Sequence, residues 1–186
     1  MNPMFFIENQ PQGQMNAHDD MDPAQAAATI IAHVTDGVAL ARQYRLPRRI
    51  DDFILEHHGT MITRYQFNKA IEAAGGNASK VDKENFRYPG PRPRSRETAL
   101  LMLADGVEAR ARAERPQDEE ALRKVVLSTI ESAQKQGQFD NTQLTLRDLS
   151  IITESFVNVL RGTHHPRVSY PKEESAVTNV LTAPRK

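Results

Sequence analysis

Phe53-Ile54-Leu55-Glu56-His57-His58-Gly59-Thr60 is the stretch that says most about the fold and chemistry of this chain. His57 follows Phe53 by four residues and His58 follows Ile54 by four, which is helical spacing. Both imidazoles are therefore expected on the apolar side of a short helix. Gly59 is suited to end that helix, because a glycine readily takes the backbone conformation found after a helix C-terminus.

A third imidazole interrupts the preceding predicted helix. Asp22 and Pro23 form a helix start, with the carboxylate as N-cap and the proline in the first turn. From there the apolar residues recur at spacings of three and four, which predicts a buried stripe: Ala27, Ile31, Val34, Val38 and Ala41. His33 belongs to a second stripe beside it, so its side chain is expected to point toward the interior.

A carboxylate interrupts the most apolar run of the chain, Leu100 to Ala104. Leu101, Met102 and Ala109 lie four residues before, three before and four after Asp105, so this carboxylate is expected to face the core or a cleft in it. An unpaired buried carboxylate is costly and normally pairs, caps or binds a cation.

The rest of the chain predicts helices and loops, and the fold class is all-α. Helices are expected over residues 61–74 and 118–136, after an N-cap at Ser95, and after an N-cap at Thr145. Three prolines between Pro89 and Pro93 predict a loop. The expected division is an N-terminal loop segment over 1–22, a helical domain over 23–162 and a C-terminal tail over 163–186.

Composition limits the function classes. The 186 residues contain 24 basic and 24 acidic side chains, so the formal net charge of zero gives no support for a DNA or RNA partner or for a polybasic membrane surface. No apolar run reaches the roughly 20 residues of a membrane span, and a cytoplasmic location is expected. There is no cysteine, so a metal would have to be held by His, Asp or Glu.

Each candidate ligand has an ordinary structural explanation when taken alone. A single buried histidine such as His33 is commonly a hydrogen-bonded core residue, and a histidine pair at a helix C-terminus can complement the helix dipole. The joint pattern favours a metal site, because three predicted helices each break their apolar stripe with a metal-competent group. His33, His57, His58 and Asp105 suit Fe, Mn, Zn or Co.

The sequence evidence for residues that contact a substrate is weaker than that for the metal ligands. Arg64 and Lys69 follow the histidine pair and could meet a phosphate. Tyr88 and the adjacent Pro89 offer flat faces on which a purine could stack. Glu97 completes this set of candidates. The remaining histidines, His18, His164 and His165, lie in polar segments and are expected to be solvated.

Five segments in fixed order resemble the cytoplasmic HD domain of the seven-transmembrane HD family, the PgpH-type cyclic di-AMP phosphodiesterases. The segments are Phe5-Phe6-Ile7-Glu8-Asn9-Gln10, Ile31-Ala32-His33-Val34-Thr35-Asp36-Gly37, Phe53 to Thr60, Phe86-Arg87-Tyr88-Pro89-Gly90-Pro91 and Met102-Leu103-Ala104-Asp105-Gly106-Val107-Glu108-Ala109. The resemblance implies an HD-like helical bundle, a di-iron or di-manganese centre, and hydrolysis of cyclic di-AMP to pApA at the cytoplasmic face of the cell membrane.

The resemblance also implies that part of the family pattern is absent. His33, His57 and His58 match imidazoles expected on one metal, and Asp105 matches a carboxylate on the other. The family's His-Asp-x-Gly-Lys segment does not occur in this sequence. Residues 23–162 are thus expected to be a partial HD domain, incomplete at its N-terminus. It is expected to bind at most one cation weakly, to self-associate, and to contact a membrane only through missing upstream helices. Alone, the chain is expected to be inactive or nearly so.

Two alternatives stay open. The chain could be a catalytically degenerate HD-like protein that binds a nucleotide or a protein partner. It could also be an HD phosphohydrolase that acts on another nucleotide.

Overall fold

The computed structural model describes residues 21–164, and within this range the regular structure is helical, apart from one isolated bridge between Ile62 and Arg87. The all-α prediction is confirmed. The elements are α1 (Pro23–Gln43), α2 (Arg48–Glu56), α3 (Arg64–Ala73), the short 3₁₀ turns η3 (Ala78–Lys80) and η4 (Lys83–Phe86), α4 (Arg96–Glu114), α5 (Glu119–Lys135) and α6 (Leu146–His164).

The helix starts follow the capping residues that the sequence indicates. The Asp22 carboxylate accepts hydrogen bonds from the backbone N–H groups of Ala24 and Gln25. Ser95 accepts from the Thr98 N–H at 3.2 Å, and Asp118 accepts from the Ala121 N–H at 2.7 Å. These contacts satisfy donors that have no partner within the first turn of a helix.

The helix predicted over 61–74 begins later than expected, at Arg64. The preceding residues pair with the chain after η4: the Thr63 N–H donates to the Phe86 carbonyl at 2.8 Å, and the Tyr88 N–H donates to the Met61 carbonyl at 2.9 Å. Thr63 therefore precedes the helix instead of continuing it, because its backbone N–H bonds to a distant segment.

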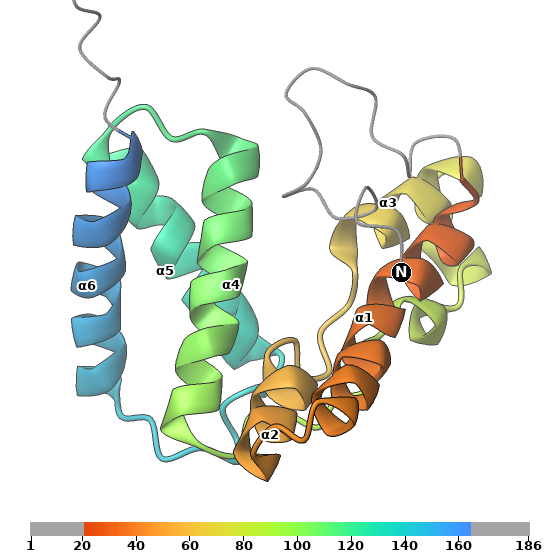
Figure 1. Ribbon diagram of the computed structural model, residues 1–186. Coiled ribbons are helices and arrows are strands. Elements are labelled where there is room, and N and C mark those ends of the chain that lie inside the picture. Colours follow the sequence, from red (N-terminus) through yellow and green to blue (C-terminus); the bar gives the residue numbers. More distant parts are fainter. Residues whose placement is uncertain (1–20, 165–186) are drawn as a thin grey trace, which may run out of the picture.

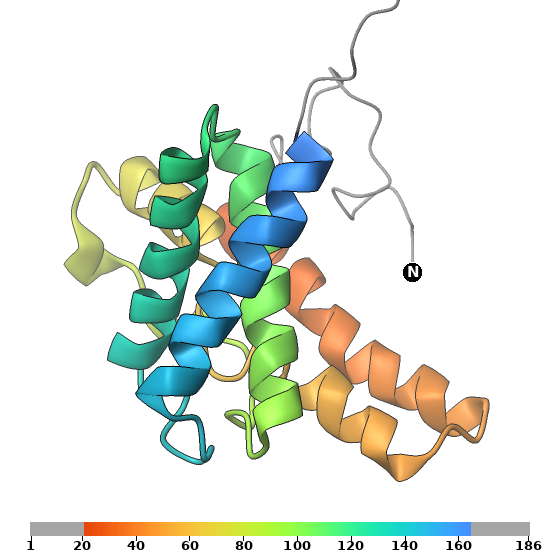
Figure 2. The same cartoon turned by 90° about the vertical axis from the view of Figure 1, so that its left-hand side faces the viewer.

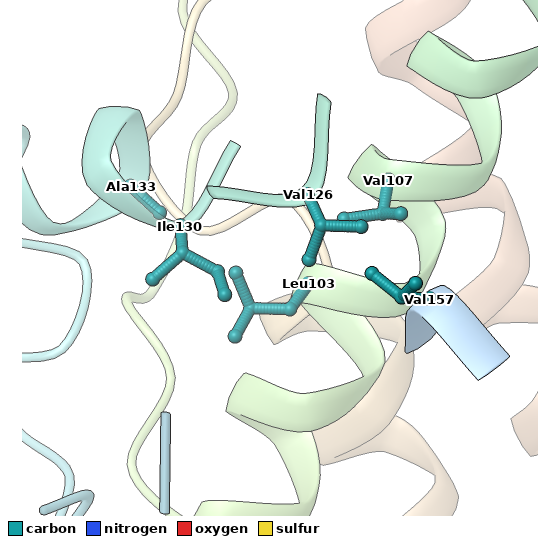
Figure 3. Packing of buried hydrophobic residues seen from close by; sticks show 6 residues of the cluster. All are labelled: Leu103, Val107, Val126, Ile130, Ala133 and Val157. Carbon is teal, nitrogen blue, oxygen red and sulfur yellow. The ribbon is translucent and has the colours of Figure 1, made fainter. Parts of the chain in front are cut away.

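Two groups of helices lie side by side (Figure 1). In the first, α4, α5 and α6 pack around a buried apolar cluster (Figure 3): Leu103, Val107, Val126, Ile130, Ala133 and Val157. Four apolar side chains of α6 also pack against this cluster: Leu149, Ile152, Phe156 and Leu160. We call this group the apolar layer.

The second group, which we call the histidine layer, consists of α1, α2 and α3. The buried residues of α1 are Ala26, Ala27, Val34, Val38 and Ala41. Among the described helices, α1 alone is long and apolar enough to cross a membrane by length and composition. Here it packs against α2, α3 and η4, and α2 also contacts α4. The turned view shows α1 and α2 projecting as a hairpin from the apolar layer (Figure 2).

Candidate metal centre

Three imidazoles converge at the junction of α1 and α2. His33 lies in the middle of α1, His57 caps the C-terminus of α2, and His58 follows it. One ligand atom from each residue can be chosen so that all three atoms lie within 4.8 Å of one another. The ring centroids of His57 and His58 are 4.0 Å apart, and that of His33 is 5.2 Å and 5.0 Å from theirs. Sequence spacing could not show this convergence, because it depends on how α1 packs against α2.

The contacts of two rings indicate which nitrogen faces the centre of the cluster. Nδ1 of His33 lies 2.6 Å from the Ile30 carbonyl, and Nδ1 of His57 lies 2.8 Å from the Ile54 carbonyl. A carbonyl oxygen can only accept, so in each neutral ring Nδ1 carries the hydrogen and Nε2 carries a lone pair. Both Nε2 atoms point at each other at 3.1 Å.

This arrangement fits a cation. Two facing lone pairs repel unless a proton or a metal ion lies between them. Two nitrogen ligands at about 2.1 Å from one ion, subtending 90–110°, are roughly 3.0 to 3.4 Å apart, and the observed 3.1 Å falls within that range. His33, His57 and His58 are therefore the residues that could hold a divalent metal.

Burial keeps two of the imidazoles neutral at physiological pH. Desolvation, followed by the neighbouring His57 and His33, lowers the pKa of His58 to about 2. Desolvation is also the main cause that lowers the pKa of His57, with a further contribution from His33. Neutral imidazole is the form that ligates a metal, so these rings are prepared for coordination without having to lose a proton first.

Asp105 lies beside the imidazoles but is not buried as the sequence predicted. Its carboxylate is 3.6 Å from Nδ1 of His58, longer than a hydrogen bond, and its side chain is 46% exposed. Among the described residues, the expectation that Asp105 faces the core is wrong, because Leu101 and Ala109 on the same face of α4 are exposed as well. The alternative expectation, a cleft in the core, stays a prediction. With His58 neutral, this contact is not an ion pair, and the carboxylate is accessible from solvent.

Tyr88 packs inside the site. Its ring is stacked on His58, with centroids 4.2 Å apart, and meets the edge of His33 at 6.1 Å. The residue is only 8% exposed, so the ring is a wall of the histidine cluster rather than the open stacking surface expected for a purine. Burial, followed by the charge of Asp105, raises the pKa of the Tyr88 hydroxyl. The neighbouring Pro89 is exposed.

Glu56, to which the sequence analysis assigned no role, anchors the histidine pair to α4. Its side chain is 1% exposed, yet its carboxylate is fully partnered. It accepts from Nε of Arg94 at 2.7 Å, from the Arg94 backbone N–H at 2.9 Å and from the Thr98 hydroxyl at 2.7 Å. A buried carboxylate held by three donors is a rigid connection.

Gln138 is a second residue that sequence reasoning did not find. It lies in the connection between α5 and α6, is 1% exposed, and accepts a hydrogen bond from the Thr60 N–H at 3.0 Å. No spacing or composition signal marks it, since the contact joins residues 78 positions apart.

The candidate substrate residues do not all gather at the histidines. Arg64 begins α3 and donates to the Ser132 hydroxyl at 3.0 Å. The Lys69 ammonium lies 4.9 Å from the Tyr65 ring centroid. Glu97 pairs with Arg49 at 3.3 Å and lies eight residues before Asp105, about 12 Å along the helix axis. Of this set, the structure brings Tyr88 to the imidazoles.

Some sequence predictions fall outside the described residues. These are the solvated state of His18 and of the side chains of His164 and His165, the N-terminal loop segment and the C-terminal tail. The division into segments stays a prediction.

Comparison with known proteins gives relatives that include two cyclic-di-AMP phosphodiesterases. The chain is 35% identical over 175 residues to the cyclic-di-AMP phosphodiesterase PgpH of Bacillus subtilis, and 31% identical over 174 residues to PgpH of Listeria monocytogenes; each alignment covers 94% of this chain and 24% of the relative. It is 39% identical over 184 residues to the uncharacterized protein slr0104 of Synechocystis, covering 98% of this chain and 22% of that protein. The chain thus spans about a quarter of the length of these relatives. No protein-family model matches.

Solved structures of the PgpH HD domain are also similar to this chain. The crystal structure of the L. monocytogenes PgpH HD domain is 31% identical, with a TM-score of 0.77, and the match covers 88% of this chain and 74% of that one. The structure of that domain in complex with cyclic-di-AMP has a TM-score of 0.79 and covers 87% and 73%.

Proposed function

Because this chain belongs to the PgpH-type HD-domain family, we propose that its histidine centre serves the hydrolysis of cyclic di-AMP to pApA. The observation that carries the proposal is the convergence of three imidazoles, two of which present Nε2 lone pairs 3.1 Å apart. A divalent cation held there, with manganese or iron as our expectation, would supply stabilisation of phosphoryl charge and a bound water of lowered pKa.

The residues of this chain would act around that ion. His33, His57 and His58 bind it, and the wall formed by Tyr88 excludes water from one side of the imidazoles. Asp105 is 46% exposed beside His58, and we propose that its carboxylate would bind a second cation. A location at the cytoplasmic face of the membrane, as the resemblance implies, belongs to the same proposal.

A groove of about 420 Å³ supports a place for the nucleotide next to this centre. Its lining includes Met61, three residues after His58, and Gly106, which follows Asp105. Arg64 also lines it and brings positive charge, whereas the charge of Arg110 is paired with Glu114 in the same lining, 2.7 Å away. We therefore keep Arg64 as a proposed phosphate contact of the substrate.

By themselves the 186 residues are proposed to turn over cyclic di-AMP slowly or not at all. The described residues bring together three imidazoles and one carboxylate, and the sequence contains no His-Asp-x-Gly-Lys segment. In two-metal hydrolases the cations lie roughly 3.5 to 4 Å apart and share the activation of one water. Three imidazoles suit one weakly held ion.

The test combines metal binding with turnover. Calorimetry of the purified 186-residue chain with MnCl₂ should show one site that is lost in His33→Ala, and chromatography should find little pApA after incubation with cyclic di-AMP. Turnover that His57→Ala abolishes would contradict the proposed inactivity. Submicromolar binding of cyclic di-AMP without hydrolysis would favour a degenerate nucleotide-binding protein.

A further inference from the structure

We propose that Gln138 is a positioning residue of the metal centre. It fixes the Gly59-Thr60 turn that follows the histidine pair, and through this turn it sets where His57 and His58 lie relative to Asp105. The inference rests on the proposed metal-binding function, and it assigns a role to a residue that acts on the imidazoles through Thr60.

Both the oxygen and the nitrogen of the Gln138 side-chain amide form hydrogen bonds. Its Oε1 accepts a hydrogen bond from the Thr60 backbone N–H at 3.0 Å. Its Nε2 donates to the Thr60 hydroxyl at 3.0 Å and to the Gln136 carbonyl at 3.1 Å. The side chain is 1% exposed, so removal of any of these bonds would leave a buried polar group unsatisfied. The amide therefore holds Thr60 in one position.

The turn and the amide fit each other closely. Gly59 has φ +51°, and a Cβ built there would lie 2.3 Å from Oε1 of Gln138 and 2.7 Å from the terminal methyl of Met102. A helix stop alone requires a residue that tolerates positive φ, for which asparagine also serves. The close approach of Gln138 requires glycine, so Gly59 gives the amide access to the chain next to His58.

The contact joins the two layers at the point where the ligands meet. His57 and His58 belong to the histidine layer, whereas Asp105 lies on α4 in the apolar layer, 3.6 Å from His58. The carboxylate of Glu56 attaches the chain to α4 immediately before the pair, and Gln138 attaches it two residues after the pair. The two imidazoles are thereby held from both sides, which fixes their distance from the carboxylate.

A purely structural tie would affect stability alone, so the experiment measures metal affinity separately. Gln138→Met keeps most of the side-chain volume but removes the three hydrogen bonds. Residues that bond a metal ligand directly change affinity by about 10- to 100-fold. Gln138 acts through Thr60, so we expect Gln138→Met to weaken Mn²⁺ binding by the lower figure, about 10-fold. Calorimetry with MnCl₂ would be done well below the melting temperature of every variant.

Two matched variants complete the design. Val157→Ala removes volume from the apolar cluster, so it should lower the melting temperature without weakening Mn²⁺ binding. Thr60→Ser keeps the hydroxyl that Gln138 contacts and should bind Mn²⁺ as the unmodified chain does. Should Gln138→Met not fold, Gln138→Asn keeps the amide on a shorter side chain, and the same loss of affinity is expected.

The outcomes separate the two proposals. If a folded Gln138 variant binds Mn²⁺ as tightly as the unmodified chain, Gln138 is only a structural tie and this inference is wrong. If the unmodified chain does not bind Mn²⁺ at all, the proposed metal centre is what fails. Weaker binding in Gln138→Met, with unchanged affinity in Val157→Ala, supports the positioning role.

Discussion

The apolar layer and the histidine layer are held together by different physical interactions. In the apolar layer, α4, α5 and α6 enclose a cluster of branched aliphatic side chains with Leu103 at 0% exposure. In the histidine layer, the buried face of α1 consists of alanine and valine, while the chain around His57 and His58 is fixed by the buried polar side chains of Glu56 and Gln138.

This difference separates stability from site geometry. Hydrophobic contacts are non-directional, so the apolar layer can adjust its packing with little effect on any one atom. Hydrogen bonds to a buried carboxylate or amide have narrow distance and angle requirements. We infer that the apolar layer supplies most of the folding free energy, whereas the polar connections decide where the imidazoles lie.

The largest effect is expected in the apolar layer. Leu103→Ala removes a fully buried side chain from the cluster, and such changes reduce the free energy of unfolding by about 3–5 kcal/mol. Urea unfolding followed by circular dichroism measures this loss. Leu127→Ala on α5 is the control, because Leu127 is 49% exposed and its loss should change stability by about 0.5 kcal/mol or less. Equal losses in the two variants would contradict the assigned core.

A smaller effect is expected at the polar connection. Gly59→Ala would strain a residue at φ +51° and push its Cβ against Gln138 and Met102. We expect a loss of about 2–3 kcal/mol, from overpacking together with the left-handed backbone. Gly162→Ala is the matched control, since a Cβ there meets nothing within 4 Å and alanine favours the helix by about 1 kcal/mol. A neutral Gly59→Ala would show that Gln138 can move.

The smallest effect is a pH dependence that belongs to the histidine layer. The folded pKa values of His57 and His58 are lowered, to about 2 for His58, whereas an unfolded histidine titrates near 6.5. The two neutral imidazoles contribute fully to the free energy of unfolding above pH 6.5. This contribution is lost as the pH falls below 6.5, because the unfolded chain then binds more protons than the folded chain.

With a chelator present, protonation of His58 in the unfolded chain should lower the unfolding free energy by about 1 kcal/mol per pH unit between pH 6.5 and 5. His57 should act in the same direction. Urea unfolding at several pH values measures the slope, and His58→Gln should make it shallower. The same slope in His58→Gln and in the unmodified chain would mean that His58 is not neutral in the folded protein.

The sequence alone predicted most of the helices and three of the proposed ligands. The periodicity of α1, the caps at Asp22 and Ser95, and the end of α2 shortly before Gly59 are local signals, because each depends on residues within one or two turns. The histidine pair and His33 could be named together as candidate ligands because separate predicted helices each break an apolar stripe with a metal-competent group.

The tertiary structure decided what depends on contacts distant in the sequence. It placed Nε2 of His33 opposite Nε2 of His57, left Asp105 at the surface and turned Tyr88 into a wall of the site. It also brought Gln138 to Thr60 across 78 residues. A periodic pattern states which face of a helix is apolar, but the partner that covers this face is set by packing between helices. The position of the ligands is therefore a property of the assembled layers.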